Sequence, residues 1–260
     1  MRDLNKLFRA RIGFSENDEI TFDKLSDVLE KTANTIPFEN ICIINKNMKD
    51  ISKVNVVDKI LKKKEGGLCY ELNSILYYFL LENGFDVELI SAVVFEQSLQ
   101  TFSPTGRTHV AILLTFNGEQ YIIDTGFGGN LPLTPVPMNG QVVSSRNGDF
   151  RVRKMVTDHG NYVMEMKLKH RHSDWVLGYA FDPSIRIENE HELNEIQKII
   201  VEHPFSPFNK KFLVTKLIDN GIMVLTDTSF TQRIAGNELK EEVTPDKFKV
   251  LAKQYFGLNI

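Results

Sequence analysis

The sequence predicts an α+β fold in which a helical N-terminal part precedes an antiparallel β part. Apolar residues recur three and four positions apart through residues 1–86, which is typical of packed helices. Short β-rich runs separated by Gly, Asn, Pro and Ser then fill residues 87–187. A connecting helix is expected over residues 188–204, and strands followed by a terminal helix over residues 205–260.

The helical part is expected to contain several helices, each with an identifiable end. Thr21 is placed to cap the first of them, which ends before Pro37 because proline disfavours helix in the residue that precedes it. Residues 54–67 predict a short helix stopped by glycine. Apolar residues at helical spacing over residues 72–80 predict a further helix, which Gly84 ends.

The β part predicts an antiparallel barrel or sheet, because its strand-like runs are short and closely spaced. They are VELISAVVF, HVAILLTF, QYIIDTGF, RVRKMV, YVMEMKLK and WVLGYAF. Asn117-Gly118 is a strong two-residue hairpin signal between two of them. In the last part, Asp219 to Gly221 predicts a second hairpin, and residues 245–256 predict the terminal helix.

The composition is that of an ordinary globular protein without a strong charge bias. Hydrophobic residues make up 42% and charged residues 25%, and 31 basic against 34 acidic residues leave a formal net charge of −3. This balance gives no electrostatic case for nucleic acid or an anionic membrane as the main partner. Neither a membrane span nor a signal peptide is apparent, and two cysteines cannot form a disulfide framework. We therefore expect a cytoplasmic protein.

Cys69 lies at the start of a predicted helix, shortly after the pair Gly66-Gly67. The unpaired N–H groups and partial positive charge of a helix N-terminus stabilise a thiolate. The two glycines permit a tight approach to the helix, with room for a substrate group against the backbone. A small buried hydrophobe is the alternative role for this cysteine, and this stretch does not decide between the two.

A thiolate nucleophile usually needs a base that a third group holds in place. Among the six histidines, His109 alone opens an apolar strand. The hairpin at Asn117-Gly118 sets a register in which Ala111 faces Asp124, so that His109 and Asp124 become diagonal neighbours about 5–8 Å apart at Cβ. The register predicts a His–Asp pair, although it does not show that this pair meets the cysteine. No metal is expected, because the spacings of Cys and His typical of metal sites are absent.

Several stretches resemble the successive signatures of the arylamine N-acetyltransferases. They are PFEN at residues 37–40, GGLCYELN at 66–73, TH at 108–109, DTGFGG at 124–129, and the ending FSPF…GIMVLTDTSFTQRIAG…FG. The resemblance covers nearly the whole chain, in order. It implies a helical bundle with the catalytic cysteine, a β-barrel with the histidine and aspartate, and a C-terminal α/β lid, on a core related to papain-like cysteine enzymes.

The resemblance also implies a ping-pong transfer that uses acetyl-coenzyme A as co-substrate. Acetyl-coenzyme A acylates Cys69, coenzyme A leaves, and an arylamine or arylhydrazine takes the acetyl group. His109 would move the protons, and Asp124 would orient His109 and stabilise its imidazolium. Backbone N–H groups, one of them from Cys69, would meet the oxyanion.

Further site residues carry over from the same resemblance. Acceptor-pocket positions are Phe38, Val94 and Phe127. Positions assigned to the coenzyme are Thr105, Gly106, Gly126 and Gly128, of which the last two keep the loop beside the thioester open.

One position departs from the family pattern. Glu65 stands immediately before the two glycines, where the family usually has an arginine that pairs with acids such as Glu39. Two negative charges would then lie near one another. We expect Lys64 or another base to answer Glu39, or the Glu65 side chain to turn to solvent.

Two other functional classes are considered: an enzyme that uses the same three residues for a different reaction, and a binding protein without catalytic activity. A cysteine hydrolase or transglutaminase-like enzyme would use the same three side chains and differ in what resolves the acyl-enzyme. A non-catalytic binding module with a decayed site is disfavoured by the intact Cys, His and Asp. A third possibility is the same chemistry with another acyl donor or acceptor.

Overall fold

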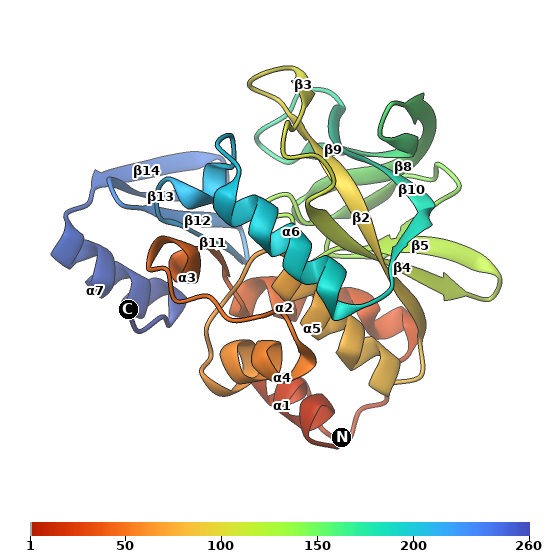
Figure 1. The fold of residues 1–260 in the computed structure, drawn as a ribbon, viewed down its shortest axis with the longest axis horizontal. Helices are drawn as coiled ribbons and strands as arrows, with labels where there is room; N and C mark the ends of the chain where they lie inside the picture. Colours follow the sequence, from red (N-terminus) through yellow and green to blue (C-terminus); the bar gives the residue numbers. More distant parts are fainter. Residues whose placement is uncertain (1) are drawn as a thin grey trace.

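A computed structural model describes residues 2–260 and confirms the α+β fold, which Figure 1 shows as a ribbon. In this view most helices of the N-terminal part lie at the bottom. The larger antiparallel sheet lies at the upper right, and a second sheet with the C-terminal helix lies at the left. Helices, barrel-like sheet and C-terminal α/β part therefore follow one another along the chain as predicted.

The N-terminal part consists of short helices around one long one. They are α1 (Arg2–Ile12), α2 (Leu25–Thr35), α3 (Ile41–Ile44), α4 (Lys53–Val56) and α5 (Cys69–Glu82). A single 3-10 turn precedes α2, and Thr21 makes no side-chain capping bond to it, so the predicted cap was wrong. The helix predicted within residues 54–67 forms as α4 and continues as a π-helical turn, η2 (Val57–Lys62).

The central helix α5 carries the apolar face that its sequence predicts. The residues at helical spacing are all buried: Leu72, Ile75, Leu76, Phe79 and Leu80. This face packs against β2 (Asp86–Glu96) and β4 (His109–Phe116) of the large sheet. Gly84 follows the helix with a φ of +83°, in the left-handed region that favours glycine after a helix end.

The large sheet curls into a nearly closed barrel of antiparallel strands. Its order is β6-β5-β4-β2-β10-β9-β8-β7, and β3 (Thr101–Phe102) pairs with β2. The remaining strands are β5 (Glu119–Ile123), β6 (Val136–Pro137), β7 (Val143–Ser145), β8 (Gly148–Thr157), β9 (Gly160–Leu168) and β10 (Val176–Ile187). A separate apolar core that includes Ile90, Leu113 and Phe181 fills its interior.

The predicted hairpin at Asn117-Gly118 forms with the expected register. Phe116 pairs with Glu119, and Asn117 and Gly118 have φ values of 51° and 80°. Positive φ at both central residues defines the type I′ turn, whose twist matches that of the strands. The ladder extends to Ile112, one residue short of the expected Ala111–Asp124 position.

The C-terminal part contains more strands than predicted. The hairpin between β11 (Leu213–Ile218) and β12 (Gly221–Thr226) was expected, whereas β13 (Ser229–Ile234) and β14 (Asn237–Glu242) were missed. Every residue of β14 is exposed, so the alternation that reveals a half-buried strand is lacking. The terminal helix α7 (Pro245–Phe256) has the predicted bounds and packs on this sheet.

A two-residue strand joins the first and last parts of the chain. β1 (Phe38–Glu39) pairs with β11 and is one of the two edge strands of the five-stranded sheet, whose order is β1-β11-β12-β13-β14. The helix expected over residues 188–204 is α6 (Glu190–Glu202). β1 belongs to the N-terminal part of the chain but pairs with a strand of the C-terminal part. The division of the chain into domains that end at residues 86, 187 and 204 therefore stays a prediction. Within residues 2–260, no helix is long and apolar enough to cross a bilayer.

Candidate active site

Cys69 is the first residue of α5, and the residue is 7% exposed. Its Sγ lies 3.5 Å from the carbonyl oxygen of Thr108, just before β4. The preceding glycines are required by close packing rather than by a turn. A Cβ on Gly66 would lie 2.1 Å from the Pro37 oxygen, and one on Gly67 would lie 2.7 Å from a Glu71 carboxylate oxygen.

His109 and Asp124 form the pair that the hairpin register predicts. His109 is the first residue of β4, Asp124 directly follows β5, and both are buried. Nε2 of the histidine lies 2.7 Å from Oδ2 of the aspartate. This contact uses Nε2 and leaves Nδ1 of the imidazole for a second partner, and Cys69 is among the groups that raise the pKa of His109.

Asn73 holds the aspartate and was missed by the sequence analysis. It lies one turn after Cys69 on α5 and is fully buried. Its Nδ2 donates to Oδ1 of Asp124 at 2.9 Å and to the Val110 carbonyl at 2.7 Å, while its Oδ1 accepts from the Thr125 N–H at 2.9 Å. A polar residue four positions after a candidate nucleophile, on the apolar face of a helix, is the signal that could have revealed it.

The electrostatics of the pair favour a charged imidazole. Burial opposes the imidazolium, but the Asp124 carboxylate and the Cys69 thiol group outweigh it and raise the pKa of His109 to about 10. The backbone N–H of Gly126 donates to Oδ1 of Asp124 at 2.7 Å and steadies the carboxylate further. The rings of Phe127 and Tyr179 lie against His109, with centroids 5.1 and 4.7 Å away.

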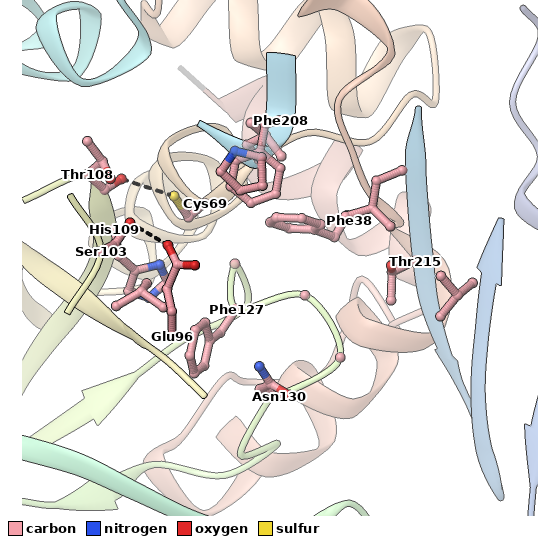
Figure 2. Close-up of a pocket in the computed structure, with 18 of the residues that line it drawn as sticks. Phe38, Cys69, Glu96, Ser103, Thr108, His109, Phe127, Asn130, Phe208 and Thr215 are labelled. Atoms are coloured by element: carbon pink, nitrogen blue, oxygen red, sulfur yellow. Dashed lines mark hydrogen bonds between the residues drawn. The ribbon is translucent and has the colours of Figure 1, made fainter. Parts of the chain in front are cut away.

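Most of the predicted site residues line one cavity of about 370 Å³ (Figure 2). Those in its wall are Phe38, Cys69, Val94, Thr105, His109, Gly126, Phe127 and Gly128. Asp124 lies behind His109, outside the wall. Gly106 is not in the wall either: it has a φ of +69° in a turn where its N–H donates to the Ser103 oxygen at 3.0 Å.

The aromatic wall contains one ring that the sequence analysis did not single out. Phe208 lies edge-on to Phe38, with centroids 5.6 Å apart, and both rings line the cavity (Figure 2). The third ring is Phe127, whose loop passes so close to the nucleophile that a Cβ on Gly126 would lie 2.5 Å from Cα of Cys69. Three rings beside a thiol and an imidazole suit a flat aromatic ligand.

A second buried cluster explains the departure at Glu65. Nζ of Lys59, on the η2 turn, lies 2.6 Å from Glu71 and 3.4 Å from Glu39 carboxylate oxygens. The sequence analysis expected Lys64 or another basic residue to pair with Glu39. The structure shows that this residue is Lys59. Burial opposes its charge, but the two carboxylates outweigh burial and hold the pKa of Lys59 well above its usual value.

This cluster fixes the start of α5. The second carboxylate oxygen of Glu71 accepts from the N–H of Leu68 at 3.0 Å, which closes a capping interaction one residue before the nucleophile. The second carboxylate oxygen of Glu39 accepts from the N–H of Ile41 at 2.6 Å. Lys59 thus ties the β1 segment, which carries Phe38, to the helix that carries Cys69.

A buried cysteine at a helix start, a His–Asp pair and an adjoining cavity with aromatic walls define a cysteine-dependent transferase or hydrolase site. Comparison with known proteins decides between a transferase and a hydrolase. A family model described as N-acetyltransferase matches residues 21–260. The chain belongs to the arylamine N-acetyltransferase family and is an acyltransferase.

Relatives with similar sequences cover most of the chain. An uncharacterised acetyltransferase of Bacillus subtilis is 36% identical over 98% of both chains. A probable arylamine N-acetyltransferase of Dictyostelium discoideum is 34% identical, over 88% of this chain and 82% of that protein.

Solved structures of arylamine N-acetyltransferases have the same fold. An arylamine N-acetyltransferase of Bacillus cereus matches with a TM-score of 0.94 and 44% identity over 100% of both chains. One from Mycobacterium marinum in complex with CoA has the same fold, with a TM-score of 0.83 and 24% identity, over 98% of this chain and 92% of that one. The Bacillus cereus enzyme is described as having a unique Cys-His-Glu triad, whereas Asp124 is the acid beside His109 here.

Proposed function

We propose that the protein transfers an acetyl group from acetyl-coenzyme A, through a thioester on Cys69, to the nitrogen of an arylamine or arylhydrazine. The observation that carries this proposal is the 2.7 Å contact of Asp124 with His109, which lines the same cavity as Cys69. A relative of the same fold was solved in complex with CoA, which supports the donor. The family supports the acceptor class.

In the first half-reaction the Sγ–H proton passes to Nδ1 of His109, and the thiolate attacks the thioester carbonyl carbon. Asp124 stabilises the imidazolium through Nε2. Collapse of the tetrahedral intermediate breaks the bond to the coenzyme A sulfur, which takes the proton back from His109. An acetyl group then stands on Cys69, and coenzyme A leaves as the free thiol.

In the second half-reaction the amine nitrogen attacks the acetyl carbonyl, and His109 accepts a proton from that nitrogen. The Cys69 sulfur leaves and regains a proton from the imidazolium. The N–H of Cys69 is among the first of α5, which have no partner within a helix, and it would stabilise the oxyanion in both steps.

The cavity wall suggests how the two substrates are held. Phe38, Phe127 and Phe208 would stack on the aromatic ring of the acceptor, and Val94 would complete its apolar surroundings. We assign the side of Thr105 and Gly106 to the donor. Gly126 and Gly128 would leave room for its thioester, and Gly128 has a φ of +59°, which disfavours any residue with a side chain.

The direct test is the intact mass of the protein after mixing with acetyl-coenzyme A. We expect wild type to gain one acetyl group, Cys69→Ala to gain none, and an arylamine to discharge the adduct. Cys42→Ala is the matched control, because it removes the other thiol and should still be acetylated. Rapid release of acetate, with no transfer to any arylamine, would instead favour the hydrolase.

A further inference from the structure

Asn147 lies in the two-residue turn between β7 and β8 and reaches the loop that forms one wall of the active-site cavity. Its Nδ2 donates to the carbonyl oxygen of Gly129 at 3.1 Å and to that of Leu131 at 2.9 Å. Both carbonyls belong to the chain between β5 and β6, which also carries Phe127 of the cavity wall. One side chain of the barrel therefore holds this loop at two points.

The loop, residues 124–135, has little regular structure of its own. It consists of turns and bends, so its backbone is not fixed by the hydrogen bonds of a sheet. Leu133 has a φ of 62°, in the left-handed region, which costs free energy for a residue with a side chain and requires surrounding contacts to maintain it. The conformation of the loop therefore depends on contacts from outside.

Two asparagines supply such contacts, one at each end of the loop. At the near end, Oδ1 of Asn73 accepts from the N–H of Thr125 at 2.9 Å. At the far end, Asn147 holds the two carbonyls. Phe127 belongs to the far end, because its carbonyl accepts from the N–H of Asn130 at 3.0 Å, and Figure 2 shows both residues on this loop. The surroundings of the nucleophile thus depend on the near end, and the direction of the phenylalanine ring depends on the far end.

The far end also packs against the C-terminal sheet. Phe127 and Ile222 lie against a small apolar cluster, which consists of Ala33, Leu131, Leu133 and Leu217. The approach is close, since a Cβ on Gly129 would lie 2.3 Å from Cδ1 of Ile222. A loop that moved away from this cluster would carry the ring of Phe127 out of the cavity wall.

The turn that carries Asn147 is itself anchored by its neighbour, Arg146. Nη1 of Arg146 donates to the carbonyl of Ile218 at the end of β11, and Nη2 donates to Oδ1 of Asn34 on α2. Nδ2 of Asn34 donates in addition to Oδ1 of Asp219 at 3.3 Å. Asn147 therefore reaches the loop from a turn that is tied to both the helical part and the C-terminal sheet.

We propose that Asn147 is a positioning residue for acceptor binding. By holding the carbonyls of Gly129 and Leu131, it keeps the ring of Phe127 where the aromatic ring of the amine would stack. The inference rests on the proposed function and adds to it a residue outside the cavity wall. The effect of Asn147 on the reaction must therefore pass through the loop.

The test separates the two half-reactions in Asn147→Ala and in Asn147→Asp, whose side chain has a similar shape but no N–H to donate. Protein acetylated on Cys69 is mixed with 4-methylaniline at increasing concentrations, and the rate of discharge is measured. We expect the half-saturating concentration to rise about tenfold, the effect of one or two lost hydrogen bonds, and the limiting rate to stay within about twofold. Acetylation of Cys69 by acetyl-coenzyme A should keep the wild-type rate, because Asn73 still holds the near end.

A second background shows whether Asn147 acts through Phe127. In Phe127→Leu, which removes the ring, the further change Asn147→Ala should alter the half-saturating concentration by less than about twofold. Asn139→Ala is the matched control and should behave as wild type. Asn139 is an exposed asparagine after β6 whose Oδ1 accepts from the N–H of Gln141 at 2.9 Å.

An unchanged half-saturating concentration in the Asn147 variants would overturn the proposal. An equal rise with and without the Phe127 ring would overturn it as well, because the effect would not pass through that ring. Acetylation of Cys69 slowed as much as its discharge would show a general disturbance of the site and would also overturn the proposal. Failure of the amine to discharge acetylated wild type would instead reject the proposed function.

Discussion

Each of the two cysteines lies beside a basic side chain and a carboxylate, yet the two surroundings favour opposite behaviour. At Cys42 the base is Lys59, whose Nζ lies 3.4 Å from the sulfur. That ammonium is already held by two carboxylates, and burial together with Glu71 raises the pKa of Cys42 to about 12. Cys42 is therefore kept as a thiol.

At Cys69 the base is an imidazole that can both accept and return a proton. Its carboxylate partner, Asp124, contacts the nitrogen away from the sulfur and leaves the other nitrogen free for the thiol. Asn73 and Gly126 supply hydrogen bonds that hold the carboxylate in place. The difference teaches that a thiol becomes a nucleophile where the neighbouring base can accept its proton, as an imidazole nitrogen can and the permanently protonated Lys59 cannot.

The largest expected effect comes from removing the charge of the acid. Asp124→Asn should lower kcat/KM for acetyl transfer by about 10⁴-fold, because an amide does not stabilise the imidazolium and favours the wrong tautomer. Steady-state kinetics with an arylamine measure the loss. Asp182→Asn, an aspartate outside the cavity whose Oδ1 accepts from Ser184, is the control and should behave as wild type. Comparable rates for the two variants would contradict the role of Asp124.

Removing the positive charge of Lys59 should instead lower the stability of the protein. Lys59→Met leaves two buried carboxylates without a cation, which should lower the free energy of unfolding by about 3–5 kcal/mol. Urea denaturation measures the loss. Lys53→Met is the control: that lysine makes a more exposed ion pair with Glu82, so the cost should stay below about 1 kcal/mol.

A second substitution sharpens this result. Glu65 lines the same cavity of about 280 Å³ as Lys59 and Glu71. An arginine introduced there in Lys59→Met should reach the carboxylates and restore part of the lost stability. A double variant no more stable than Lys59→Met would show that residue 65 cannot take over the charge.

Alkylation compares the two cysteines directly. Cys42 is the more exposed of the two, so access alone would predict that it reacts first. Because the thiolate is the reactive form, we expect iodoacetamide at neutral pH to modify Cys69 more than about a hundredfold faster. Peptide mass mapping over time gives both rates. Faster labelling of Cys42 would mean that access outweighs the electrostatic difference.

The smallest effect concerns pH. The pKa of His109 is raised to about 10 from an ordinary value of about 6.5, so its protonated form is favoured by the fold. The stability that this pair contributes is full below about pH 6.5 and is lost as the pH rises through about 10. NMR titration of the imidazole should give a midpoint near the raised value, and a lower one in Cys69→Ala. An unshifted midpoint would contradict the pairing.

Local signals predicted the parts of the site that lie close together in the hairpin. Asn117-Gly118 fixed a register, and the register brought His109 and Asp124 together. Helix position alone singled out Cys69, whereas the family resemblance was needed to join it to the pair. Contacts between distant segments were beyond this reasoning.

Asn73 and Lys59 show why such contacts are missed. Asn73 is a single polar residue in an apolar helix, and its partners lie on another strand and loop. Lys59 stands three residues before the run Lys62 to Lys64, which is typical of a solvated surface, and the π-helical turn buries it. Phe208 reaches Phe38 only because β1 and β11 pair.

The pairing of β1 with β11 has a consequence for the order in which the protein is made. Phe38, a wall of the active-site cavity, pairs with Thr215, near the end of the chain. Contacts between such distant residues form late, and during synthesis they must wait for the second partner to leave the ribosome. A nascent chain that already contains Cys69, His109 and Asp124 therefore still lacks the strand that pairs with β1 beside the active-site cavity.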